Sequence, residues 1–281
     1  MSPLSPQPNP DYLDHWSLKY PPFLGNPDFF FSGQPQRETL AALQYFAASS
    51  WKLAFLTAVS QSGVTHLLDH LVSMRGLGDC PIDVILTRGS SDHSSSIHQL
   101  GAAYSVDGDI DIEVVRHKID AAIRQSDREG IRTLWLIEKC TVSNMSIASD
   151  LARKHRNFSV VATTQPDERT ALQLSAGMYG MQIQLNQFCL QDTADYVETA
   201  LRHAGGEQRI FSEASTARLH ELSVGVIGDA AVIAESALTA AACRSLPMIT
   251  PDIIDLVFEI HRQWRSGRHG YHRESLASMS A

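Results

Sequence analysis

Short apolar runs alternate with amphipathic segments through the first two thirds of the chain. The apolar runs, which are typical of buried strands, lie at residues 53–57, 83–87, 133–139 and 159–166, and Gln182-Ile183-Gln184-Leu185 is expected to be the last strand of the sheet. Between them, apolar side chains recur at helical spacing at residues 36–48, 66–74, 112–128 and 144–156. Strands that alternate with helices pair in parallel, so the pattern predicts an α/β fold with a parallel sheet flanked by helices.

From Asp192 onward the pattern changes to helices alone. We expect these helices at residues 193–204, 213–222, 229–242 and 250–264. The last begins with Thr250-Pro251-Asp252, a favourable N-terminal cap and first turn. A helical stretch of about 75 residues has the size of a small domain, so a small all-helical lid domain is expected after the sheet.

The two ends of the chain differ from the middle in composition. Residues 1–11 are rich in proline, which predicts a disordered or extended tail, and residues 266–281 are polar and read as a flexible tail. The expected domains are therefore an α/β domain at 12–189 and a helical lid at 190–265. The N-terminus lacks a basic start and an apolar core, and no apolar run reaches the roughly 20 residues that span a bilayer, so the expected location is cytoplasmic.

The loop after the first apolar strand carries the strongest functional signal. A buried strand, a small-residue loop and a helix follow one another here, as in a phosphate-binding loop, where backbone amides and the helix N-terminus hold phosphate. Thr65 stands where such a loop provides a ligand for Mg²⁺. The candidate nucleotide-binding residues are Ala58, Ser60, Ser62, Gly63, Val64, Thr65 and His66.

The same loop lacks the residues that make phosphate binding strong. Val64 replaces the expected lysine and offers neither a charge nor a hydrogen-bond donor. Ala58 and Gln61 replace glycines that would let the backbone approach a phosphate closely. An ordinary strand, loop and helix of an α/β core is the alternative interpretation.

A second candidate position is the end of the apolar run 133–139. In nucleotide-binding sheets this strand ends in an acidic pair that orders Mg²⁺ and activates water. Here the pair is Glu138-Lys139, so Glu138 is a remnant acidic residue that could share a metal ion with Thr65, while Lys139 cannot act as a carboxylate base. Lys139 could equally be a solvated strand end, and Thr163 and Thr164 are either γ-phosphate sensors or ordinary strand-end hydroxyls.

Charge and composition exclude some classes of ligand. The net charge of −8 gives no overall attraction to nucleic acid, which is therefore not a default partner. The four cysteines lie far apart, and the twelve histidines are scattered, so no disulfide framework or further metal site is predicted.

The chain resembles the AAA+ ATPase family of the general-secretion-pathway A type, relatives of the transposition ATPases of the TniB and MuB kind. The likeness runs from about residue 13 to residue 264. It is carried by Tyr20-Pro21-Pro22-Phe23, Phe29-Phe30-Phe31-Ser32, Glu38-Thr39-Leu40, Leu56-Thr57, Gly63, Thr65, Leu134-Trp135-Leu136-Ile137-Glu138, Gln184-Leu185, Asp195-Tyr196-Val197, Leu201-Arg202-His203-Ala204-Gly205, Ile210-Phe211-Ser212, Ser223-Val224-Gly225 and Ala237-Leu238.

The resemblance implies a P-loop AAA+ domain and a helical lid whose charged catalytic positions are altered. Besides Val64 and Glu138-Lys139, Gln182 falls near an expected arginine, and Ile227-Gly228 falls where the lid normally carries Pro-Arg. Because phosphoryl transfer depends on such charges, these changes together imply a pseudo-ATPase.

The leading hypothesis is an interaction or regulatory scaffold, linked to secretion or cell-envelope assembly. Its partners would be a competent AAA+ relative or further copies of the chain, and a membrane would enter only through a partner. The alternative is an atypical ATPase of the secretion or transposition type, in which Lys139 or another basic side chain replaces the loop lysine. Between the two lies weak binding of ATP or ADP with Mg²⁺ without hydrolysis; DNA binding rests on analogy with the transposition relatives.

Overall fold

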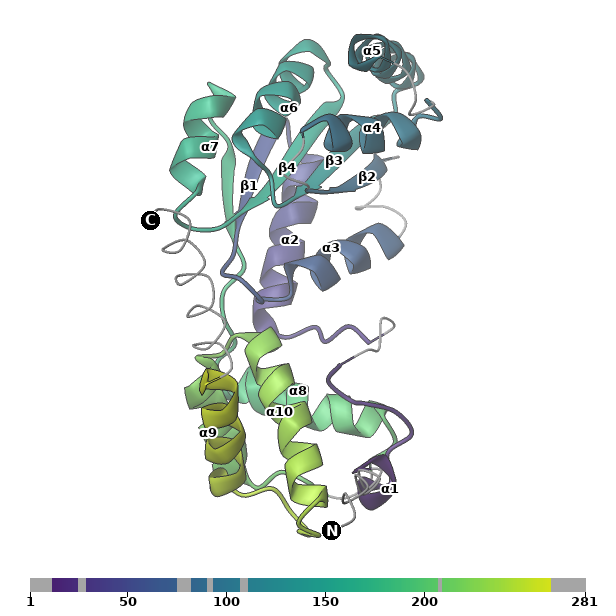
Figure 1. Ribbon diagram of the computed structural model, residues 1–281. Coiled ribbons are helices and arrows are strands. Elements are labelled where there is room, and N and C mark those ends of the chain that lie inside the picture. The colour runs from purple at the N-terminus through teal and green to yellow at the C-terminus, as the bar shows by residue number, and fades with distance from the viewer. Residues whose placement is uncertain are drawn as a thin grey trace, which may run out of the picture. The chain divides into compact units, whose positions relative to one another are not determined.

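The computed structural model describes residues 12–24, 29–74, 82–89, 93–106, 111–206 and 209–263. They form two compact units (Figure 1), an α/β unit spanning Gln34–Asn186 and a helical unit that joins the residues up to Gly33 with those from Gln187 onward. Each unit has its own buried apolar cluster.

The α/β unit is built on a five-stranded parallel sheet with the strand order β2-β3-β4-β1-β5. Strands β1, β3 and β4 are buried over almost their whole length, which explains why the sequence shows apolar runs rather than alternation. The strands are β1 Leu53–Thr57, β2 Ile82–Arg88, β3 Arg132–Glu138, β4 Phe158–Thr164 and β5 Met181–Gln184.

Helices flank this sheet on both faces (Figure 1). One face packs against α4, α5, α6 and α7 in a single core around Trp135 and Phe158. Helices α2 and α3 lie on the other side (Figure 1), where Phe46, Leu67 and Leu71 are buried. The helices are α2 Gln34–Ala48, α3 Val64–Ser73, α4 His93–Ala103, α5 Ile112–Glu129, α6 Val142–Lys154 and α7 Arg169–Ala176.

The fold class expected from the sequence, a parallel sheet flanked by helices with a helical part after it, is confirmed. All five strands and most helices lie within a few residues of their expected positions. Helices α4 and α7 were not expected. Helix α4 has three consecutive serines in its first turns, and α7 has only 8 residues, so neither gives a clear apolar repeat.

The helical unit consists of α8 Leu190–His203, α9 Glu213–Ser223, α10 Ile227–Ala242 and a helix over residues 251–263, together with α1 Tyr12–Trp16. Its core contains Trp16 and Phe23 from the N-terminal segment. The indole N–H of Trp16 donates to the Leu238 carbonyl at 3.0 Å, and the Phe23 amide donates to the buried Glu235 carboxylate at 3.0 Å. The expected division grouped residues 12–33 with the α/β domain, whereas here they belong to the helical unit.

Among the described helices, none combines the length and apolar character needed to cross a bilayer. The expected tails at 1–11 and 266–281 lie outside the described residues.

Candidate functional site

A pocket of about 950 Å³ lies at the carboxyl edge of the sheet, in the α/β unit. Its walls are the loop after β1, the tips of β3 and β4, and the first residues of α6 and α7. Of the residues proposed from the sequence, the pocket brings together Ala58, Ser60, Ser62, Gly63, Val64, Thr65 and Glu138. His66 is exposed on the first turn of α3 and does not line the pocket.

The loop keeps a conformation suited to holding an anion. Gly63 takes a left-handed conformation with a φ of 85° directly before α3, and no side chain caps this helix. The first backbone amides of an α-helix have no acceptor within the helix, so these amides are available at the pocket. The Ser62 hydroxyl lines the same pocket, is buried, and has no hydrogen-bond partner among the described residues.

Gln61 adopts the backbone geometry that a glycine would adopt at lower cost. Its φ is 63°, in the left-handed region that side chains disfavour. The sequence indicated a lost glycine at this position. The turn is nevertheless formed with glutamine in place.

A ring of polar contacts closes around the buried Glu138. The Thr65 hydroxyl donates to one carboxylate oxygen of Glu138, and the Arg88 guanidinium contacts the other at 3.2 Å. Arg88 also pairs with Asp69 at 2.6 Å. Since Thr65 and Asp69 lie four residues apart on α3, the ring ties one face of this helix to the ends of β2 and β3.

The sequence pattern does not single out Arg88 or Gly89, which the structure places beside Glu138. Arg88 is the last residue of β2 and pairs in register with Glu138, the last residue of β3. The Gly89 amide donates to the Glu138 carbonyl at 2.6 Å, and a Cβ on Gly89 would lie 2.3 Å from that oxygen, so only glycine permits this approach. The sequence shows an arginine followed by a glycine at the end of a strand. It does not show that β2 pairs with β3, and this pairing places Arg88 beside Glu138.

Lys139 lines the pocket next to Glu138. Its backbone is left-handed, with a φ of 53°, a conformation that costs a non-glycine residue roughly 1–2 kcal/mol. The Thr163 hydroxyl accepts a hydrogen bond from the Lys139 amide at 2.7 Å, and the Thr163 carbonyl accepts one from the Cys140 amide at 2.9 Å. Thr163 is thus a buried strand-end residue that fixes the turn after β3.

The cysteine in the pocket wall is not an activated nucleophile. Cys140 lies in this wall, and burial raises the pKa of this thiol to about 12, so it stays protonated at neutral pH. No group of three or more His, Cys, Asp or Glu side chains that could hold a metal ion occurs in the described part of the chain.

The resemblance to AAA+ ATPases implies ATP with Mg²⁺ at this edge of the sheet. The residues fit the phosphate and the metal ion of that ligand differently. The uncapped start of α3, the left-handed Gly63 and the unpartnered Ser62 hydroxyl fit a phosphate group. Val64 gives that phosphate no cation, and both carboxylate oxygens of Glu138 are engaged by Thr65 and Arg88. The phosphate cradle therefore fits, and the metal position does not.

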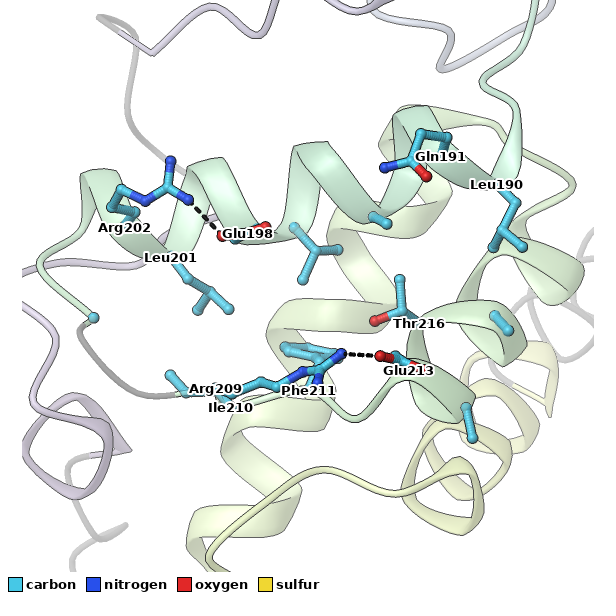
Figure 2. Close-up of a pocket in the computed structure, with 15 residues that line it drawn as sticks. Leu190, Gln191, Glu198, Leu201, Arg202, Arg209, Ile210, Phe211, Glu213 and Thr216 are labelled. Atoms are coloured by element: carbon cyan, nitrogen blue, oxygen red, sulfur yellow. Dashed lines mark hydrogen bonds and ion pairs between the residues drawn. The ribbon is translucent and has the colours of Figure 1, made fainter.

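A second hollow, of about 830 Å³, lies in the helical unit between α8 and α9. Figure 2 shows Arg202 and Glu198 paired on α8, and Arg209 paired with Glu213 near the start of α9, around an apolar lining that includes Phe211. The pairs measure 2.5 and 2.8 Å. Both pairs are exposed, and each has no net charge. None of the candidate residues from the sequence lines this hollow, so we place the functional site at the sheet edge.

Comparisons with known proteins place the fold. No model of a protein family matches the sequence, and no curated protein matches it. Solved structures of other proteins do match this chain. The Orc1 protein of Aeropyrum pernix, solved in complex with DNA, has a TM-score of 0.61 at 12% identity, covering 85% of this chain and 68% of that chain.

Two further structures give the same result. Drosophila ORC bound to DNA has a TM-score of 0.60 at 12% identity and covers 91% of this chain and 67% of that chain. Cdc6p of Pyrobaculum aerophilum has a TM-score of 0.60 at 11% identity, with 81% and 67% covered. The chain therefore has an AAA+ fold of the Orc/Cdc6 kind, a P-loop parallel sheet flanked by helices with a helical part after it.

Proposed function

We propose that this chain is a degenerate AAA+ protein, a pseudo-ATPase that acts as an interaction or regulatory scaffold. The observation that carries the proposal is the charge arrangement at the pocket. Val64 occupies the loop position that would hold the phosphate cation, and Glu138, the carboxylate at the end of β3, is already paired with Arg88.

Phosphoryl transfer is driven mainly by the placement of charge around the transferred group. One arginine at such a site can be worth about 10³-fold or more in rate. Here Lys139 follows Glu138, so no carboxylate stands there to activate water. The two positions near which the resemblance predicts an arginine carry other residues. Gln182 is an exposed residue of β5 whose side-chain amide donates to the Gly180 carbonyl, and Gly228 lies in the first turn of α10.

The phosphate cradle supports nucleotide binding without turnover as part of this function. A bound nucleotide would stabilise the α/β unit by mass action, by about 2.7 kcal/mol when its concentration is 100 times the dissociation constant. In a scaffold, bound nucleotide would favour the conformation that partner proteins bind. We propose a competent AAA+ relative or further copies of this chain as the partners, in secretion or cell-envelope assembly.

The test is a thermal-shift titration with ATP and ADP, run with turnover assays on purified protein. In a Val64→Lys variant we expect a concentration-dependent rise in Tm that exceeds any rise in the native chain, because the loop regains its cation. Val142→Lys is the matched control, since Val142 lines the same pocket at the start of α6 and is 51% exposed. Sustained ATP turnover by the native protein would refute the proposed loss of activity.

An atypical ATPase is the second candidate, because Lys139 lines the same pocket as the loop and makes no ion pair within the described residues. In that case native turnover should be lost in Lys139→Met and in Thr65→Ala. Turnover that persists in both variants would indicate a contaminating enzyme.

DNA binding is suggested by the two DNA-bound neighbours alone. The net charge of −8 works against it, and binding that falls steeply with salt would be needed to support it.

A further inference from the structure

The buried Glu138 needs a positive charge near it, and the chain supplies one. The Glu138 side chain is 8% exposed, and an isolated buried carboxylate is strongly unfavourable. Arg88 provides the counter-charge through a contact of 3.2 Å from its guanidinium. In the AAA+ fold, the carboxylate at this strand end is the one expected to face a metal ion.

We propose that Arg88 takes the place of a metal ion at Glu138, so that a phosphate-bearing ligand binds the loop without a divalent metal. The inference rests on the proposed function, in which the loop keeps its phosphate cradle but not its ATPase chemistry. It adds a property that the pseudo-ATPase proposal does not contain, namely that binding is independent of Mg²⁺.

Arg88 is positioned by the backbone as well as by its charge partners. Its Cα pairs in register with that of Glu138, and the Gly89 amide bonds the Glu138 carbonyl, so the two strand ends are fixed side by side. The Arg88 amide donates to the Gln99 side chain at 2.9 Å, which also anchors this strand end. The guanidinium therefore reaches Glu138 from a defined position.

The charge partners hold Arg88 from two sides. Asp69 binds one guanidinium nitrogen at 2.6 Å and Glu138 binds another. The Asp69 pair is half exposed and contributes little by itself, whereas the Glu138 end is buried. The hydrogen bond to Asp69, more than any other contact, raises the pKa of Arg88 above its usual value, so the group stays charged at any working pH.

A divalent ion would have to displace this guanidinium or lie beside it. Displacement would break the contacts with Asp69 and Glu138, and a shared position would bring like charges together near Glu138. Mg²⁺ also gives up its water reluctantly and needs carboxylate or phosphate oxygens in return. The carboxylates of Asp167 and Glu168 also line the pocket, so the test must separate them from Glu138.

The experiment uses the full chain with ADP as the nucleotide probe and Mn²⁺ as the metal probe. Tm is measured across an ADP titration in excess EDTA and in excess Mg²⁺, in the native chain and in the Val64→Lys variant, whose loop has a cation. The proposal expects the ADP-induced shift to be the same with and without Mg²⁺. In Arg88→Gln, on either background, the shift should become dependent on Mg²⁺.

Bound Mn²⁺ is measured directly by electron paramagnetic resonance. Arg88→Gln should bind Mn²⁺ about tenfold or more tightly than the native chain, because it leaves Glu138 without its counter-charge. Adding Glu138→Gln to Arg88→Gln should remove that gain, which assigns the ion to Glu138 rather than to Asp167 or Glu168. Arg88→Lys should keep the native behaviour, and Arg116→Gln, an exposed arginine on α5, is the control for lost charge.

The outcomes separate the two proposals. Two results would overturn the inference and leave the scaffold proposal intact. One is that the native chain binds Mn²⁺ as tightly as Arg88→Gln does. The other is that the ADP-induced rise in Tm requires Mg²⁺ in chains that retain Arg88. A failure of ADP to shift Tm even in Val64→Lys would also overturn the inference. Sustained ATP turnover by the native chain would instead overturn the pseudo-ATPase proposal.

Discussion

At the scale of single residues, one buried charge of the α/β unit that has three charged or ionisable neighbours lies outside the residues that line the pocket. Asp120 on α5 is buried, and its carboxylate contacts His155 at 2.8 Å, Lys154 at 2.5 Å and Arg124 at 2.7 Å. Burial alone would raise the pKa of Asp120. The hydrogen bonds from Lys154 and His155, with the charges of Lys154 and Arg124, outweigh that effect and lower the pKa below its usual 3.8.

This cluster gives a prediction with a defined pH dependence. A carboxyl group whose pKa is lower in the folded state stabilises the fold above its unfolded pKa and loses that contribution as the pH falls through the folded value. Asp120→Asn should therefore cost about 1.5–3 kcal/mol at pH 7, the usual value of hydrogen bonds to charged groups, and progressively less below about pH 4.

Chemical denaturation of both proteins between pH 3 and pH 8 measures the difference. Asp150→Asn, which removes an exposed carboxylate paired with Arg153, is the control and should change little. A constant difference across this pH range would show that the charge of Asp120 is not what stabilises the fold.

At the scale of elements, strands β1, β3 and β4 were predictable because their burial leaves an unbroken or nearly unbroken apolar run. The loop after β1 was predictable as the connection between a strand and a helix, since small residues there separate a buried strand from an amphipathic helix. Its role as a phosphate cradle stays a prediction. Arg88 was not predictable as its neighbour. Strand order decides which strand ends meet, and a single sequence does not give the order β2-β3-β4-β1-β5.

The end of helix α9 provides a second prediction. Val224 ends this helix in a left-handed conformation with a φ of 51°, although it is β-branched and 67% exposed. Val224→Gly should stabilise the helical unit by about 1 kcal/mol, because glycine adopts this conformation without strain and little apolar burial is lost. The midpoint of chemical denaturation reports the change.

The neighbouring glycine should respond in the opposite direction. A Cβ on Gly225 would lie 2.2 Å from the Phe188 carbonyl oxygen, and the φ of Gly225 is 71°. Gly225→Ala therefore combines a backbone clash with strain and should destabilise the same unit by more than about 2 kcal/mol. Equal effects of the two substitutions would contradict the assignment of strain to Val224.

At the scale of the whole molecule, the chain passes through the helical unit, then the α/β unit, and then the helical unit again. The aromatic segment near the N-terminus was expected to pack on a neighbouring core, but periodicity cannot say which core. The structure gives the answer through side-chain contacts. Phe23, Phe29 and Phe31 each lie against Tyr196 of α8, with ring centroids 5.6–6.4 Å apart.

Because each unit has its own apolar core, a core substitution should weaken one unit more than the other. Trp16→Ala removes a side chain that is 8% exposed and also its hydrogen bond to the Leu238 carbonyl. We expect a cost of about 3–5 kcal/mol, which is typical of a buried tryptophan, with amide exchange rising in α8 and α10. Strands β1, β3 and β4 should keep their protection.

Trp135→Ala is the matched substitution in the other core, since Trp135 is 1% exposed and its indole N–H donates to the Thr87 hydroxyl at 2.9 Å. It should raise amide exchange in the sheet and leave α8 and α10 protected. Hydrogen exchange followed by mass spectrometry resolves both patterns in the intact chain. If both substitutions raised amide exchange equally in both units, the two cores would unfold as one cooperative structure. A ligand bound at the sheet edge would then stabilise the N-terminal aromatic segment as strongly as it stabilises the loop after β1.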